Sequence, residues 1–364
     1  MKSDLDKTYM QKALKLALLG QGLTKTNPIV GCVIVKNNIV IAEGCHSEFG
    51  GPHAEAKALS KAGLNAKGAS LYVTLEPCFP FKGKKTPPCV ERIIKAGIKR
   101  CVIAMKDPNP KINGRSISLL GRSGVKTETG LMEEEAKSIN RPYMKVLKTG
   151  LPLVISKMAL TLDGKVATYS GDSKWISNDM SRTLVHYKRS KFDAVMVGIG
   201  TVIKDNPELN VRKIKGRDPV RVIIDPCCEI SLRAKVFKDK KKVLLIVNTS
   251  AKKNKVDKLL EAGIRVLCVE GKGGTVNLKK ALALLPVLGI SSVMLEGGPT
   301  LLTAALKEKV VDQILWFIAP KILGSDAKSV VGNLALRTIK KAITVKDLKC
   351  YCLGGDLVVE GRVN

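Results

Sequence analysis

The chain has 364 residues, and its 62 Lys and Arg against 32 Asp and Glu give a formal net charge of +30. This length favours two domains over one. Aromatic residues make up only 4% of the chain, which is few for the base-stacking surfaces of proteins that bind single-stranded nucleic acid. The basic residues are spread over both halves and form no concentrated basic patch. We expect no specific nucleic-acid partner; small anionic substrates would benefit from the positive charge.

Cysteine usage and hydropathy restrict the compartment. The chain has ten Cys, but residues 1–6 are polar and lack the apolar segment of a secretory signal. This favours the reducing cytoplasm over a disulfide-bonded secreted protein. The longest apolar run, 281–290, is too short to cross a bilayer and contains Pro286. We therefore expect no membrane segment.

Helix and strand signals alternate in the first half. Apolar residues at helical spacing predict an amphipathic helix over 7–19, and two strands, 29–35 and 39–42, flank a tight turn at Asn37 and Asn38. Further helices are expected at 53–61, 89–96, 117–122 and 131–139, and strands at 69–75 and 100–105. The pattern predicts a three-layer α/β domain in which the helices at 53 and 89 begin at one edge of the sheet.

A second α/β pattern follows a segment, 141–152, that has little periodic signal. We place the boundary near Gly150 and expect domains 1–148 and 149–364. Strands are predicted at 153–160, 194–198, 220–225, 243–247, 265–269, 292–296 and 313–319, and helices at 179–190, 253–262, 277–285 and 299–309. No Gly-x-Gly-x-x-Gly follows a strand, which argues against an ordinary Rossmann dinucleotide domain.

Residues that can bind zinc are concentrated between 51 and 89. His53 is followed two residues later by Glu55, and Cys78 and Cys89 each follow a Pro. One imidazole and two thiolates make a tripod for tetrahedral Zn²⁺ with an open position for water, whose pKa the metal lowers. Zinc deaminases place a proton-carrying Glu at this spacing. Each residue alone is compatible with a core or surface role, but together they predict one zinc per chain.

Two glycine-rich turns in the second half offer backbone N–H groups. One spans 197–201; the other spans 296–300, where Pro299 suits the first turn of a helix. Free N–H groups at a helix N-terminus bind phosphate, and Gly permits close approach. A single turn of this kind is common, but two in one domain suggest a phosphate-rich cofactor.

Ten stretches together resemble the bifunctional riboflavin-biosynthesis deaminase/reductase family, and the likeness covers nearly the whole chain. They are 26–35, 50–55, 72–78, 86–89, 107–110, 157–165, 171–176, 197–201, 205–207 and 296–301. The resemblance implies a cytidine-deaminase-like first domain and a dihydrofolate-reductase-like second domain. The implied reactions are zinc-dependent deamination of 2,5-diamino-6-ribosylamino-4(3H)-pyrimidinone 5′-phosphate and NADPH-dependent reduction of its ribosyl side chain, which together give 5-amino-6-ribitylamino-uracil 5′-phosphate.

The resemblance also implies residue roles. In the deaminase, Glu55 would shuttle the proton and Asn27 would help to hold the pyrimidine. NADPH contacts are expected from Ala159, Trp175, Thr201, Asp205, Gly298, Pro299, Thr300 and Leu301. Contacts to the substrate of the reductase are expected from Lys157, Ser173, Arg189, Leu209, Arg212 and Glu296. These types suit the task, since Arg can bind phosphate bidentately and a carboxylate can accept from sugar hydroxyls.

The chain departs from the family between the two Cys ligands. The family reads Ser-His-His-Gly there, whereas this chain has a longer loop, Phe79, Pro80, Phe81, Lys82, Gly83, Lys84 and Lys85. Loops tied to a metal site often carry substrate contacts. We predict that Lys82, Lys84 or Lys85 lies near the 5′-phosphate and that Phe79 or Phe81 packs on an apolar part of the substrate. A smaller departure is Ser116, where the family has Gly.

Two other hypotheses were compared with the bifunctional enzyme. A nucleic-acid-editing deaminase would have no use for the motifs of the second half. A protein with one decayed domain would not retain catalytic residues in both halves. A homo-oligomer is compatible with the sequence.

Overall fold

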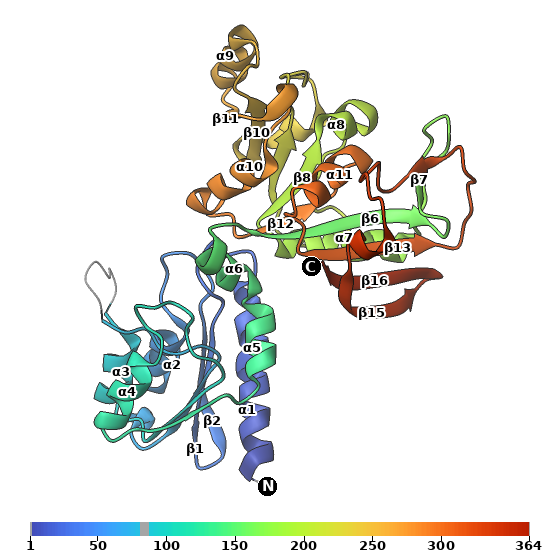
Figure 1. Ribbon diagram of the computed structural model, residues 1–364. Helices are drawn as coiled ribbons and strands as arrows, with labels where there is room; N and C mark the ends of the chain where they lie inside the picture. Colours follow the sequence, from blue (N-terminus) through green and yellow to red (C-terminus); the bar gives the residue numbers. More distant parts are fainter. Residues whose placement is uncertain (1, 81–86, 364) are drawn as a thin grey trace. The chain divides into compact units, whose positions relative to one another are not determined.

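The computed structural model describes residues 2–80 and 87–363 (Figure 1). The chain divides into two compact units, Met1–Gly150 and Leu151–Asn364. Across the described ranges, none of the helices combines the length and the apolar character needed to cross a membrane. The Lys-rich segment 81–86, on which the prediction about Lys82, Lys84 and Lys85 rests, lies outside the described residues.

The first unit contains a five-stranded sheet with the order β2-β1-β3-β4-β5. The strands are β1 (Gly31–Lys36), β2 (Ile39–Cys45), β3 (Ser70–Val73), β4 (Arg100–Ile103) and β5 (Lys126–Thr129). β1 pairs antiparallel with β2 and β3, whereas β3, β4 and β5 are parallel. The predicted hairpin is confirmed: Asn37 and Asn38 have positive φ angles of 52° and 61°, which Asn tolerates better than most residues.

Helices cover both faces of this sheet. They are α1 (Lys2–Ala17), α2 (Ala54–Ala62), α3 (Cys89–Lys95), α4 (Arg115–Arg122), α5 (Glu133–Ile139) and α6 (Arg141–Thr149). A Cβ on Gly31 would lie 1.9 Å from a carbonyl oxygen of α1, and a Cβ on Gly44 would lie 2.1 Å from one of α2. Gly44 pairs with Cys32, the neighbour of Gly31, so the two glycines face opposite sides of the sheet. The predicted three layers are therefore present.

Helix α6 was not predicted, because the segment 141–152 has little periodic signal. Pro142 occupies the first turn, where its missing N–H costs nothing, and Gly150 ends the helix with a φ of 69°. None of its residues is fully buried. The periodic apolar pattern that predicts an amphipathic helix is therefore weak in this segment. Strand β5 was also not predicted; it lies at the edge of the sheet and reads Lys-Thr-Glu-Thr.

The second unit contains a nine-stranded sheet with the order β11-β10-β9-β8-β12-β6-β13-β16-β15. The predicted strands are β6 (Leu153–Thr161), β8 (Ala194–Gly198), β9 (Val220–Ile224), β10 (Val243–Asn248), β11 (Arg265–Val269), β12 (Ser292–Leu295) and β13 (Gln313–Ala319). All of these are parallel. Four further strands were not predicted: β7 (Lys165–Ala167), β14 (Lys328–Ser329), β15 (Val345–Leu353) and β16 (Asp356–Val363). β16 adds antiparallel to β13, and β15 forms the outer edge (Figure 1).

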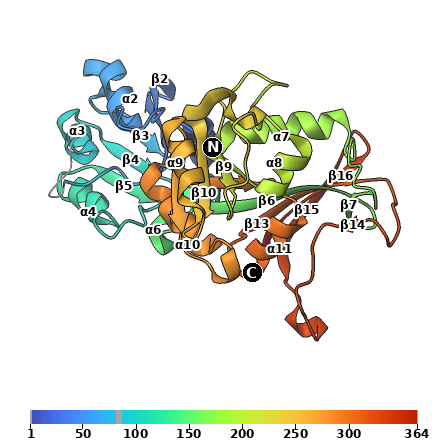
Figure 2. The ribbon, with the colours of Figure 1, turned by 90° about the horizontal axis from the view of Figure 1, so that it is seen from above.

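Two hydrophobic clusters cover the two faces of this sheet. The helices are α7 (Asp179–Lys191), α8 (Ile199–Asp205), α9 (Lys253–Glu261), α10 (Leu278–Leu284) and α11 (Pro299–Lys307). Apolar residues of α7, α8 and α9 pack on one face, and those of α10 and α11 pack on the other. Figure 2 shows α7 and α8 on the opposite side of the strands from α11. Short 3-10 turns occur at Leu18–Gly20, Gly63–Ala66, Lys235–Lys242, Lys272–Gly274, Pro286–Leu288 and Ile339–Lys341.

The strand order creates a crevice in the middle of this sheet. β12 returns to lie between β8 and β6, and the helices that follow β8 and β12 go to opposite faces. In open α/β sheets, ligands bind outside the carboxyl ends of the strands where the order reverses in this way.

Candidate functional site

The predicted zinc ligands come together in the first unit. His53 is the residue before α2, Cys89 is the first residue of α3, and Cys78 lies in the segment after β3. His53 Nδ1 lies 3.4 Å from Cys78 Sγ and 3.3 Å from Cys89 Sγ, and all three ligand atoms lie within 4.8 Å of one another. A tetrahedral zinc with ordinary Zn–N and Zn–S bonds separates such atoms by roughly 3.5 Å. The residues present therefore fit a zinc ion.

The backbone around the tripod favours thiolates. The Cys89 N–H donates to Cys78 Sγ at 3.2 Å, and Cys89 begins α3, where the helix dipole stabilises negative charge. Both sulfurs are buried and pack against Ile112 and the half-buried Phe79. The site is thus shielded from water on this side.

Glu55 lies in the first turn of α2 and is buried, with an exposed fraction of 3%. Burial raises the pKa of its carboxyl to about 7, and the nearby Cys78 sulfur acts in the same direction. A carboxyl with this pKa can both take up and release a proton near neutral pH.

A cavity of about 560 Å³ opens beside the tripod and includes His53 and Cys89 in its wall. Three basic side chains of α2 and α3, Lys57, Lys61 and Arg92, also line it, and no carboxylate does among the described residues. Such a cavity favours an anionic ligand. Asn27 lies in the loop before β1 and is not part of this wall.

Glu76, which belongs to the same motif as Cys78, has a structural role. Its carboxylate accepts the backbone N–H groups of Asp107 at 3.2 Å, Gly114 at 2.9 Å and Ser116 at 3.1 Å. These bonds hold the segment 107–116 next to the metal ligand. Ser116 contributes its backbone, so its replacement of the family's Gly leaves this contact intact.

His46 is a residue of this site that the sequence reasoning missed. Its ring meets the His53 ring edge-on, with 5.5 Å between centroids. Nδ1 lies 3.2 Å from the Pro52 carbonyl oxygen, while Nε2 is buried without a hydrogen-bond partner among the described residues. Burial lowers the pKa of His46. No spacing in the sequence separates His46 from an ordinary core histidine.

The second unit has a cavity of about 780 Å³ at the crevice in its sheet. With one exception, every residue predicted to contact NADPH or the substrate of the reductase lies in its wall. The exception is Leu209, whose side chain packs in the hydrophobic core and whose backbone has a positive φ of 53°. Seven Lys or Arg side chains and three carboxylates line the cavity, which favours anionic ligands.

A buried ion cluster lies at the centre of this cavity. Arg189 donates to both oxygens of Glu296, through Nε at 2.6 Å and Nη2 at 2.9 Å, and Lys157 Nζ lies 3.5 Å from Glu296 Oε2. Burial alone would raise the pKa of Glu296, but the Arg189 and Lys157 charges outweigh it and lower this pKa to about 2. Burial lowers the pKa of Lys157. Glu296 therefore stays ionised at neutral pH.

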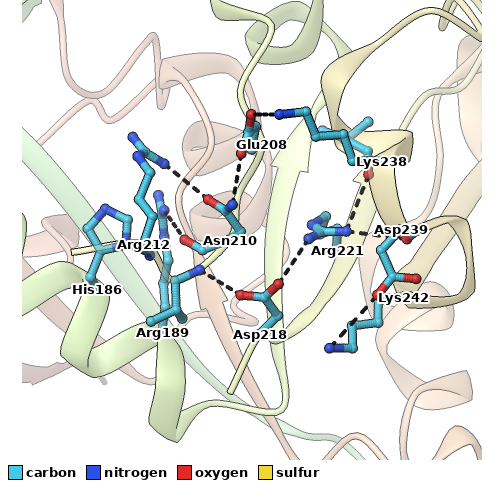
Figure 3. A network of polar contacts seen from close by, with 12 residues as sticks. His186, Arg189, Glu208, Asn210, Arg212, Asp218, Arg221, Lys238, Asp239 and Lys242 are labelled. Carbon is cyan, nitrogen blue, oxygen red and sulfur yellow. Dashed lines mark hydrogen bonds and ion pairs between the residues drawn. The ribbon is translucent and has the colours of Figure 1, made fainter. Parts of the chain in front are cut away.

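A network of polar contacts fixes the loop that carries Arg212 (Figure 3). Asn210 is its hub: its carbonyl accepts from Arg189 Nη1 at 3.0 Å, its Oδ1 accepts from Arg212 Nη1 at 3.2 Å, and its amide donates to Glu208 at 2.8 Å. Asp218 accepts the next backbone N–H, that of Val211, at 2.7 Å. Glu208, Asn210 and Asp218 were not predicted, because none of them belongs to a motif.

The turn before α11 exposes backbone to the cavity. Gly298 caps the helix and Pro299 is its first residue. A Cβ on Gly297 would lie 2.7 Å from Leu301 Cδ2, so packing requires that glycine. A Cβ on Gly298 would meet nothing closer than Thr201 Oγ1 at 3.8 Å. The space in front of Gly298 is therefore open for a ligand, and the helix N-terminus favours a phosphate there.

Comparison with known proteins gives the family. Residues 3–105 match the model "Cytidine and deoxycytidylate deaminase zinc-binding region", and residues 152–359 match the "RibD C-terminal domain". The riboflavin biosynthesis protein RibD of Aquifex aeolicus is 43% identical over 98% of both chains, and that of Escherichia coli is 36% identical over 97% of this chain and 98% of the relative.

Solved structures agree over the full length. Acinetobacter baumannii RibD superposes with a TM-score of 0.88 at 35% identity, and both chains are covered completely. The diaminohydroxyphosphoribosylaminopyrimidine deaminase/5-amino-6-(5-phosphoribosylamino)uracil reductase of Thermotoga maritima gives 0.85 at 33% identity, again with complete coverage. The chain belongs to the RibD family of riboflavin-biosynthesis enzymes, with a zinc-binding deaminase region followed by a pyrimidine reductase domain.

Proposed function

We propose that the first unit deaminates 2,5-diamino-6-ribosylamino-4(3H)-pyrimidinone 5′-phosphate and that the second reduces the ribosyl side chain of the product with NADPH. The observation that carries this proposal is the presence of two complete and different sites in one chain. One has a metal tripod with a buried carboxylate of raised pKa. The other has a cavity lined by phosphate-binding groups and an ion cluster.

In the deaminase, His53, Cys78 and Cys89 hold the zinc ion. When bound, zinc supplies Lewis acidity that makes a water nucleophilic near neutral pH. Glu55 moves two protons in turn: its carboxylate takes one from the attacking water and gives it to the ring nitrogen, then takes the proton of the new C–OH group and gives it to the amine, which leaves as ammonia. Lys57, Lys61 and Arg92, which line the cavity, attract the phosphate ester. Asn27 helps to hold the pyrimidine.

In the reductase, the turn at Gly298 and the first residues of α11 receive a phosphate of NADPH. Thr201 and Asp205 of α8 and Trp175 line the same cavity and contact the cofactor. Arg212 is exposed and gives one N–H to Asn210, and its remaining N–H groups bind the phosphate of the substrate together with Ser173. Glu296, kept ionised by Arg189 and Lys157, accepts hydrogen bonds from the sugar hydroxyls.

The order of the two reactions can be tested by incubating the zinc-loaded protein with the diaminopyrimidine phosphate, with and without NADPH, and resolving the products by mass. Without NADPH, we expect one product in which an amino group has been replaced by oxygen. With NADPH, a second product with two additional hydrogens should appear. Reduction without prior deamination, or no deamination at all, would contradict the proposal.

A further inference from the structure

His186 is a buried histidine in the reductase cavity that has no role in the reactions described so far. It lies on α7 one turn before Arg189, has an exposed fraction of 4%, and forms part of the cavity wall. Figure 3 shows its ring beside Arg212 and Arg189. It therefore lies where the substrate phosphate is proposed to bind.

The two ring nitrogens of His186 have different surroundings. Nδ1 accepts the backbone N–H of Arg212 at 3.3 Å, and the backbone of Asn210 also contacts the ring and opposes the lowering of its pKa. Among the described residues, none of the side-chain hydrogen bonds uses Nε2. This nitrogen is also not among the fully buried polar atoms that lack a partner, so it remains accessible. A neutral imidazole carries one proton, and because Nδ1 is the acceptor here, that proton is on Nε2. The ring thus offers an N–H donor at the cavity wall.

The neighbours of His186 keep it neutral. Burial lowers the pKa of His186 to about 4, and the positive charges of Arg189 and Arg212 act in the same direction. At neutral pH the ring can therefore accept with Nδ1 and donate with Nε2 simultaneously. Arg189 is committed to Glu296 and Asn210. Arg212 gives one N–H to Asn210 Oδ1, and its other N–H groups and His186 are the donors of this group that remain for a ligand.

We propose that His186 binds the phosphate of the substrate of the reductase through Nε2–H and positions Arg212 for the same phosphate through Nδ1. The proposal rests on the proposed function of this cavity. It assigns the phosphate two hydrogen-bond donors. One is the neutral imidazole of His186 on α7, and the other is the charged guanidinium of Arg212 in the loop after α8. No sugar or pyridine contact is assigned to His186.

Three substitutions separate the two halves of this role. His186→Asn places an amide oxygen near Nδ1 and keeps the acceptor for Arg212 but removes the donor at Nε2. His186→Gln reaches the position of Nε2 with an amide N–H but loses the acceptor. His186→Leu removes both. Each variant is compared with the unaltered protein for reduction of the deaminated ribosyl phosphate and of the same compound without its phosphate, and for calorimetric binding of the phosphate ester in the absence of NADPH.

With His186→Asn we expect KM for the phosphate ester, and its Kd, to rise roughly tenfold or more, as when a hydrogen bond to a charged group is lost. KM for NADPH, kcat and the reaction of the dephosphorylated compound should change less than about twofold. His186→Gln should recover part of the affinity, and His186→Leu should be the weakest. Equal losses with and without the phosphate would reduce His186 to a packing residue and overturn the proposal, as would wild-type affinity in His186→Asn. If the unaltered protein binds neither compound, the proposed function fails instead.

Discussion

Glu55 and Glu296 are both buried carboxylates in a candidate active site, but their surroundings shift their pKa values in opposite directions. Burial and a neighbouring sulfur raise the pKa of Glu55 to about 7. The Glu296 side chain is also largely buried, with 6% of its surface exposed, yet the charges of Arg189 and Lys157 overcome the effect of burial and lower its pKa to about 2. The same residue type is therefore prepared for proton transfer in one unit and for a permanent negative charge in the other.

The difference follows from what each reaction needs. Deamination moves protons between water, ring and leaving amine, so a group that titrates near pH 7 is useful. Hydride transfer from a nicotinamide is the chemistry of the cofactor, and the protein supplies orientation and charge. A carboxylate that never titrates, clamped by a bidentate Arg, is suited to orientation.

The largest effect expected concerns the metal. Replacing Cys78 and Cys89 together by Ser should abolish zinc binding, because two of the three ligands lose their thiolates. Deamination should be lost with the metal, and NADPH-dependent reduction of deaminated substrate should persist. Metal analysis of the purified variant measures this, and the double replacement of the exposed Cys227 and Cys350 by Ser serves as the control. Zinc retained in the first variant would contradict the assignment of the ligands.

The charge clamp of the reductase can be broken by Glu296→Gln. This change leaves Arg189 and Lys157 buried without their counter-charge, which should lower the free energy of unfolding by roughly 3–5 kcal/mol. Both tryptophans, Trp175 and Trp316, lie in the second unit, so denaturation followed by Trp fluorescence reports on that unit.

The matched control is Glu270→Gln. Glu270 forms an exposed ion pair with Lys280 in the same unit, and its loss should cost less than about 1 kcal/mol. Deamination should be unaffected in both variants. Similar stabilities for the two variants would show that the clamp around Glu296 contributes no more than a surface pair.

Acid should weaken the reductase unit through His186. Its pKa is about 4 in the folded protein and 6.5 when unperturbed, so between these values the unfolded chain binds more protons. The free energy of unfolding should therefore fall as pH falls from about 6.5 to 4, by roughly 1–3 kcal/mol from this residue. The measurement is denaturation at several pH values, followed by Trp fluorescence. His186→Gln cannot titrate and should show a shallower slope; an unchanged slope would mean that another group is responsible.

The smallest effect expected concerns the loop between the Cys ligands. Replacing Lys82, Lys84 and Lys85 by Ala should raise KM for deamination several-fold, because the predicted attraction to the substrate phosphate is lost, and should leave zinc content unchanged, because Lys is not among the predicted zinc ligands. Steady-state kinetics measures this, and the exposed Lys252, Lys253 and Lys255, replaced together by Ala, provide the control. An unchanged KM would make the loop a solvated insertion.

The two sites also differ in how far the sequence reveals them. His53, Cys78 and Cys89 follow one another within a short segment, and their order and spacing alone predict the tripod. Arg189 and Glu296 are 107 positions apart, and nothing in either local sequence indicates that they meet. Their assignment to one site came from family resemblance, and the geometry of the clamp required the fold.

The secondary-structure predictions also depended on what the local sequence reveals. The buried strands of the second unit were predicted because they are short apolar runs, as β10 is with every residue buried. β15 is exposed along nearly all its length and gives no such run. It is held by backbone pairing with β16, which side-chain patterns do not report. His186 and Asn210 were missed for a related reason, since His186 accepts the backbone N–H of Arg212 and the backbone carbonyl of Asn210 accepts from Arg189, and both partners are distant in sequence.

The central claim is that one chain carries two independent sites, and the most direct measurement is made on Glu55→Gln. This change keeps the shape of the side chain but removes the proton carrier, so deamination should fall by a factor of roughly 10² to 10⁴ or more.

The same preparation, given deaminated substrate and NADPH, should reduce it within about twofold of the unaltered rate, with zinc content unchanged. The reciprocal variant Gly298→Val should weaken NADPH use and spare deamination, because a branched side chain would fill the space in front of the turn. Loss of both activities in Glu55→Gln, with fold and zinc intact, would contradict the account and require a shared site or obligatory coupling.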